Sequence, residues 1–84
     1  MDNKFTSQED LFKKLLPALR TKKHEIARST KIKISEKDIW EYNKQNVWRK
    51  SHGLTLASMV DDILNTFDQD YIDYKENKEE NGDN

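Results

Sequence analysis

Hydrophobic residues recur along most of the chain at the spacing of amphipathic helices. From Leu11 to Ile26 they return every three or four residues, which places them on one face of a helix. Thr6 or Ser7, each followed three residues later by an acid, can cap the start of this helix. Pro17 interrupts the apolar series, so we expect it either to kink the helix or to open a second one.

A second helix is predicted from Ser35, a residue type favoured at N-caps, to about Trp48. Trp40 lies on the apolar face of this helix and is expected in the core. Between the two helices, Ile32 and Ile34 alternate with lysines over a stretch that is too short to form a sheet. We therefore expect an extended connector whose isoleucines enter the core.

The third predicted helix carries the longest apolar stripe in the chain. Thr55 can cap it, and the stripe repeats at helical spacing over roughly five turns. Its members are Leu56, Met59, Val60, Ile63, Leu64, Phe67, Tyr71 and Tyr74. The run from Glu76 to Asn84 contains no apolar residue, so we expect a disordered acidic tail.

Together these elements predict an all-α fold, a compact domain of three helices, or of four if Pro17 splits the first. The expected organisation is a flexible N-terminus at residues 1–6, a single helical domain at 7–74 and a disordered acidic tail at 75–84. A chain of 84 residues can bury only one small core.

Charge is unevenly distributed, although the net charge is only −1. Residues 1–53 carry a net charge of +6 and residues 54–84 a net charge of −7. Such an asymmetry is typical of a polyanion-binding face, and equally of two halves that attract each other within one small domain.

Several kinds of chemistry are missing. The chain has no cysteine, which excludes a disulfide scaffold, a cysteine-ligated zinc site and a thiol nucleophile. His24 and His52 are not at metal-ligand spacing, and no glycine-rich loop or Ser-His-Asp arrangement occurs. We therefore expect no enzymatic activity, no cofactor, no metal and no small-molecule substrate. Because no apolar run could span a bilayer or act as a signal peptide, we expect a cytoplasmic protein without membrane insertion.

Trp48 is followed directly by two cations, and another precedes it by about one helical turn. Surfaces that bind single-stranded nucleic acid combine aromatic rings, which stack on bases, with cations that hold phosphates. A tryptophan that closes a small core beneath an arginine side chain has the same local sequence. The candidate nucleic-acid-binding residues are Lys22, Lys23, Arg28, Lys31, Lys33, Lys44, Trp48, Arg49 and Lys50.

Three segments stand in a distinctive order: residues 34–42 with the Ile39-Trp40 pair, residues 47–50 with Trp48, and residues 54–64 ending in Asp-Ile-Leu. Together with the Leu-Leu-Pro segment before them, they resemble the ComN-type post-transcriptional regulators, small cytoplasmic proteins of low-GC Gram-positive bacteria. The resemblance covers about residues 15–74. It implies a post-transcriptional role, exerted on mRNA directly or through a protein partner, and it carries over no catalytic residue.

Two functions are therefore open. The first is a regulator that grips mRNA through its basic first half. The second is an adaptor that docks a helix of a protein scaffold and does not touch nucleic acid. The candidate partner-docking residues lie on the third predicted helix and are Phe67, Tyr71 and Tyr74.

Overall fold

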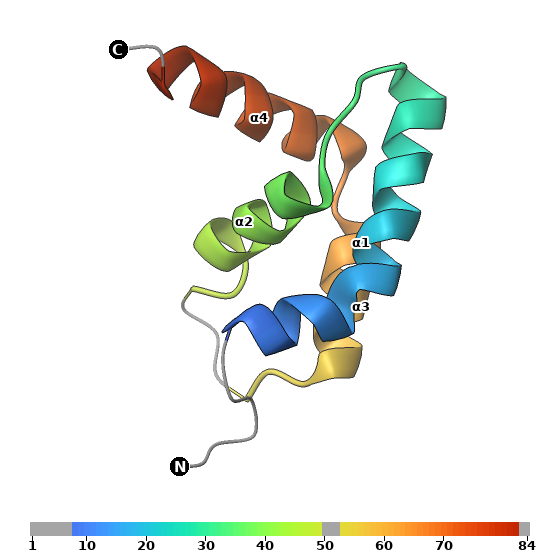
Figure 1. The fold of residues 1–84 in the computed structure, drawn as a ribbon, viewed down its shortest axis with the longest axis vertical. Helices are drawn as coiled ribbons and strands as arrows, with labels where there is room; N and C mark the ends of the chain where they lie inside the picture. The colour runs from blue at the N-terminus through green and yellow to red at the C-terminus, as the bar shows by residue number, and fades with distance from the viewer. Residues whose placement is uncertain (1–7, 50–52, 83–84) are drawn as a thin grey trace.

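The computed structural model describes residues 8–49 and 53–82 (Figure 1). These residues form α1 (Gln8–Thr30), α2 (Glu36–Asn46), α3 (Leu56–Asn65) and α4 (Asp68–Gly82). Neither range contains a strand, so the prediction of an all-α fold is confirmed. The predicted flexible N-terminus at residues 1–6 lies outside the described residues, and the limits of a single domain at 7–74 stay a prediction.

The prediction of three helices is wrong, and the additional helix does not come from Pro17. The helix α1 continues through Pro17, and its axis bends between the blue N-terminal part and the cyan part that follows (Figure 1). Beyond the proline, the Thr21 hydroxyl donates to the Pro17 carbonyl at 3.0 Å. The proline therefore kinks the helix, which was one of the two alternatives, without dividing it.

The fourth helix arises from a break inside the predicted third one. Thr66 leaves the helical region with a ψ of 141°, and its N–H and hydroxyl both donate to the Asp62 carbonyl, at 3.2 and 2.7 Å. These bonds end α3. The next helix starts at Asp68 with acids in its first turn, where they favour a helix N-terminus.

The predicted disordered tail is also wrong, because α4 continues to Gly82. Lys78 fastens this part of the helix to α2: its Nζ lies 2.8 Å from Asp38 Oδ1 and 3.0 Å from Glu41 Oε1. The hydrogen bond to Asp38, reinforced by Glu41, raises the pKa of the Lys78 ammonium above its ordinary value. Polar residues can thus extend a helix when one of them finds partners on a neighbouring element.

Two capping boxes fix the starts of α2 and α3 at the residues that the sequence indicated. The Ser35 hydroxyl accepts from the Asp38 N–H and the Asp38 carboxylate from the Ser35 N–H, both at 3.1 Å. Thr55 and Ser58 make the same reciprocal pair. Each N-cap is typically worth about 1 kcal/mol.

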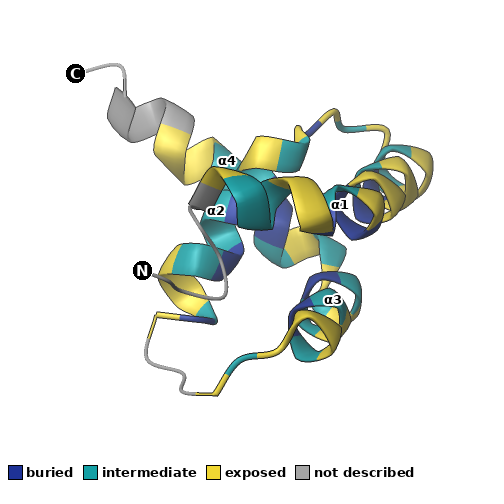
Figure 2. Cartoon of the chain, turned by 60° about the horizontal axis from the view of Figure 1, so that its bottom comes forward, coloured by how far each residue is buried: buried dark blue, intermediate teal, exposed yellow. Residues whose placement is uncertain are grey.

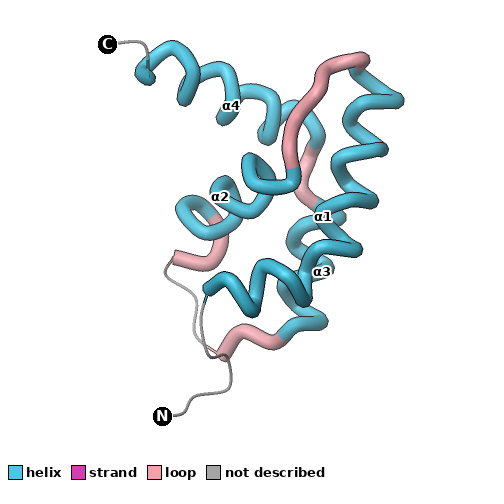
Figure 3. Tube along the Cα trace, viewed as in Figure 1, coloured by secondary structure: helices cyan, strands magenta, loops and turns pink. Residues whose placement is uncertain are grey.

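The core lies where α1, α2 and α3 meet, and α4 packs on α2. Buried residues occupy the inner helix faces and exposed residues the outer ones (Figure 2). The connector after α1 is a long loop that returns to the start of α2 (Figure 3), and it places Ile34 in the core with 3% exposure. The largest fully buried side chains are Leu15, Leu19, Ile26, Ile39, Asn43, Ile63, Tyr71 and Ile72.

Candidate nucleic-acid interface

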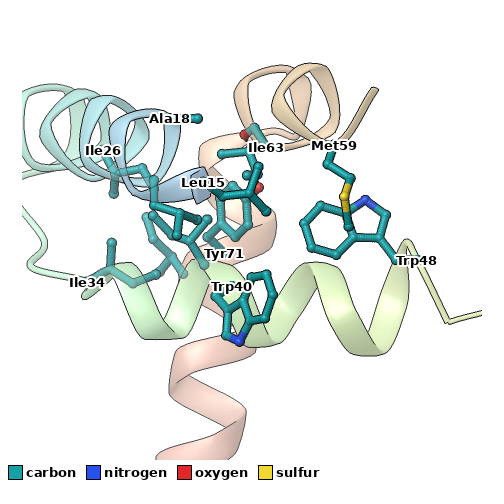
Figure 4. Close-up of a cluster of buried hydrophobic side chains, with 12 residues drawn as sticks. Leu15, Ala18, Ile26, Ile34, Trp40, Trp48, Met59, Ile63 and Tyr71 are labelled. Atoms are coloured by element: carbon teal, nitrogen blue, oxygen red, sulfur yellow. Dashed lines mark hydrogen bonds between the residues drawn. The ribbon is translucent and has the colours of Figure 1, made fainter. Parts of the chain in front are cut away.

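The Trp40 and Trp48 side chains lie beside each other in the core (Figure 4). Trp40 is buried on α2, and Trp48 directly follows the C-cap residue Val47. Their ring centroids are 5.9 Å apart at an interplanar angle of 65°, an edge-to-face contact. Phe12 of α1 makes a similar contact with Trp40 at 5.5 Å. The exposed fractions of Trp40 and Trp48 are 6% and 7%, so both indoles belong to the core.

The Trp48 indole is also held by a hydrogen bond that it donates to another helix. Its Nε1 donates to Asp62 Oδ2 of α3 at 2.8 Å. Ring packing and this bond together fix the side chain that closes the core between α2 and α3. Trp48 therefore does not offer an open ring face on which a base could stack.

A hollow of about 490 Å³ opens beside the two rings. Buried Trp40, Trp48 and Met59 supply an apolar floor, and the exposed side chains of Gln45 and Arg49 stand at its edge. Its lining among the described residues comes from α1, α2, α3 and the segment after α2, and consists of Leu11, Trp40, Lys44, Gln45, Trp48, Arg49 and Met59.

Two of the predicted phosphate-binding cations belong to this hollow. Lys44 holds its Nζ 5.4 Å from the centroid of the Trp40 ring, a cation–π distance. Arg49 is exposed directly after Trp48. The structure thus brings together Lys44, Trp48 and Arg49 of the predicted set, whereas Lys50 lies outside the described residues.

The remaining candidate cations are elsewhere. Lys23 lies 3.4 Å from Glu36 Oε1 and is part of the contact between α1 and α2. Arg28, Lys31 and Lys33 are exposed at the end of α1 and in the connector. In Figure 1 this end of α1 lies far from the end of α2 that carries the hollow. The candidate cations therefore do not form one continuous patch.

Lys22 is a structural residue in this fold. It is 2% exposed, and its Nζ lies 2.9 Å from Asp68 Oδ1 and 3.1 Å from Glu25 Oε2. It also donates to the Leu64 carbonyl at 3.3 Å. The ammonium thus binds α1 to the break between α3 and α4, and its predicted role in holding phosphates does not fit this buried position.

The charges of this ion pair stabilise each other. Burial opposes the charge on Lys22, but hydrogen bonds and attraction from Asp68 and Glu25 outweigh it and raise the pKa of the ammonium. Burial likewise opposes the charge on Asp68, but the Lys22 ammonium and the Ser29 hydroxyl donate to it and lower its pKa below 3.8. Both groups are therefore ionised at neutral pH.

The predicted partner-docking residues differ in their exposure to solvent. Phe67 sits in the break between α3 and α4 and is 77% exposed. Tyr71 is fully buried: its hydroxyl donates to the Ile63 carbonyl at 3.0 Å and accepts from Asn43 Nδ2 at 2.9 Å. Tyr74 is half-buried. Because Thr66 and Phe67 interrupt the helix, the stripe is rotated, and its tyrosine end faces α2 instead of a partner.

Sequence reasoning missed Leu11, Gln45 and Met59 as lining residues. No local pattern joins them, because they come from three different helices. The role of Asp62 as an acceptor could not be predicted either, because it depends on how Trp48 packs against α3. Among the residues at the hollow, only the Trp48-Arg49 pair was indicated by a local sequence pattern.

Within residues 8–49 and 53–82, no three His, Asp or Glu side chains gather in a way that could hold a metal ion. No helix in this described part is long and apolar enough to cross a membrane.

Fold and site together define a small all-α domain with an aromatic hollow edged by cations. Residues 9–84 match the model of a family described as post-transcriptional regulators. The chain therefore belongs to the post-transcriptional regulator family, whose description names a regulatory role and no reaction. No curated protein and no solved structure gives a significant match.

Proposed function

We propose that this protein regulates gene expression after transcription by binding single-stranded mRNA directly and without catalysing a reaction. We place it with the ComN-type regulators and in the bacterial cytoplasm. The observation that carries the proposal is the hollow with aromatic walls and two cations in a member of a post-transcriptional regulator family.

Charge distribution supports an approach of RNA from the side of α1 and α2. Arg49 and Lys44 offer positive charge beside apolar rings, the combination that single-stranded nucleic acid surfaces use. In contrast, the exposed carboxylates of Asp61, Asp73 and Glu76 lie on α3 and α4, where they repel phosphates. The exposed cations Arg28, Lys31 and Lys33 form a second basic group that a long strand could reach along the 40 Å axis of the molecule.

The direct test is a titration of fluorescently labelled single-stranded RNA, with anisotropy measured at several salt concentrations. Binding should weaken steeply with salt because the cations release counterions from the phosphates. Replacing both Lys44 and Arg49 with Ala should lower the affinity about tenfold and make the salt slope shallower by about 0.7 for each lost phosphate contact.

Arg20→Ala is the matched control, since it removes the same side chain from an exposed position on α1 that does not line the hollow. It should change the affinity less than threefold by loss of general attraction alone. Absence of binding at low salt would exclude direct RNA contact.

Exposed Phe67 favours a second candidate function, the docking of a protein scaffold. Large exposed apolar side chains are typical anchors of protein interfaces. A photo-crosslinking amino acid placed at position 45 or 67 in living cells separates the two functions. RNA adducts at 45 support direct binding, whereas protein adducts at 67 without RNA adducts at 45 support an adaptor.

A further inference from the structure

The hollow has the size of a ligand site. Its volume of about 490 Å³ lies within the range of about 300–1,000 Å³ that small-molecule pockets occupy. Its floor consists of the buried rings of Trp40 and Trp48 with Met59 beside them (Figure 4). A thioether and aromatic edges together form a soft, polarizable wall for a planar ring.

Three of the described residues that line the hollow are polar. Lys44 and Arg49 line it with positive charge, and Gln45 adds an exposed amide that can donate and accept. No carboxylate lines it among the described residues. An occupant with a planar apolar part, polar edges and attached negative charge is therefore complementary to it.

The two rings are packed edge to face and almost fully buried, so a base cannot lie flat on a tryptophan at the surface. It can instead enter the hollow and contact the ring edges from inside. A duplex cannot supply such a base without breaking a pair, which requires unstacking and unpairing energy. This geometry selects unpaired bases.

We propose that the hollow receives one unpaired nucleobase of a single-stranded RNA, with Arg49 and Lys44 on the flanking phosphates and Gln45 at the base edge. This inference rests on the proposed function, and it adds how the RNA is recognised. An apolar side chain of a protein partner is the alternative occupant.

Gln45→Trp tests the proposal without removing any charge. Position 45 is exposed on α2, so the larger side chain can fill the hollow while the fold is retained. Asn46→Trp is the matched control, because the next residue is also exposed but does not line the hollow. We expect at least tenfold weaker binding of labelled single-stranded RNA for Gln45→Trp and less than twofold for Asn46→Trp.

The RNA provides a second test. An abasic nucleotide introduced in turn at each position of the bound oligonucleotide should weaken binding at one position far more than at the others. The same sequence in a perfect duplex should bind weakly. Intrinsic emission reports the contact directly, because the chain has two tryptophans and both line the hollow. Single-stranded RNA should change this emission in the wild-type protein.

The outcomes separate the two proposals. Suppose that the wild-type protein binds RNA, and that neither Gln45→Trp nor any abasic nucleotide changes the affinity. Then the hollow does not hold a base, although the proposed function stands. If the wild-type protein binds no RNA at low salt, both fail. Unaffected RNA binding together with protein adducts from a crosslinker at position 45 would give the hollow to a partner side chain and overturn the inference.

Discussion

The indole N–H of Trp48 donates to the carboxylate of Asp62 over 2.8 Å, and this bond joins the segment that follows α2 to the middle of α3. The same indole forms part of the floor of the hollow. One hydrogen bond thus fixes both the packing of two helices and the shape of the candidate site.

Asp62→Ala should therefore destabilise the protein by about 1–2 kcal/mol, because it leaves a mostly buried indole N–H without its acceptor. Asp61→Ala is the control, since Asp61 is exposed beside it. Urea unfolding followed by tryptophan emission measures both. Equal stability of the two variants would show that the bond contributes nothing.

The ion pair between Lys22 and Asp68 gives a second prediction. Asp68→Asn should lower the free energy of unfolding by about 2–3 kcal/mol, because a buried ammonium keeps only Glu25 as a charged partner. Asp73→Asn removes an exposed carboxylate from the same helix and should cost less than about 0.5 kcal/mol. Chemical denaturation at neutral pH compares them.

Acid should unfold the protein through the same residue. Asp68 and Asp38 both have a pKa below the ordinary 3.8. A carboxylate whose pKa is lower in the folded state gives stability that is complete above the unfolded-state pKa and is lost as the pH falls through the folded-state value. The urea midpoint should stay level above about pH 5 and fall toward pH 2. Asp68→Asn should have a shallower fall, and an identical slope would contradict this assignment.

The Tyr71 hydroxyl supports a fourth prediction. It links the Asn43 amide of α2 to the Ile63 carbonyl of α3, all in the core. Tyr71→Phe should cost about 1–2 kcal/mol, because the buried amide and carbonyl both lose a partner. Tyr74→Phe, at a half-buried ring on the same helix, should cost less. Thermal unfolding followed by circular dichroism distinguishes them.

Local chemistry explains why the sequence predicted some elements well. The caps at Ser35 and Thr55 depend on residues three positions away, so both helix starts could be predicted. The bend at Pro17 follows from the proline ring alone. The burial of Lys22 was not predicted, because its partner Asp68 comes from a distant part of the chain.

Other features depend on contacts between distant residues. The apolar stripe runs without interruption through Thr66 and Phe67, although the extended backbone at Thr66 ends the helix there. The sequence therefore gave no reason to separate exposed Phe67 from buried Tyr71. The hollow is equally non-local, because Leu11 and Met59 meet only when α1 and α3 have packed.

The bend in α1 lowers the stability of this helix and changes the direction of its axis. A proline inside a helix costs about 3 kcal/mol relative to alanine, because it removes a backbone hydrogen bond and crowds the preceding turn. In return, a single helix changes direction: the part before Pro17 lies against Trp40 through Phe12, and the part after it carries Lys22 to Asp68. The bend at Pro17 lets one helix contact both Trp40, beside the hollow, and Asp68, at the start of α4, at a cost in local helical stability.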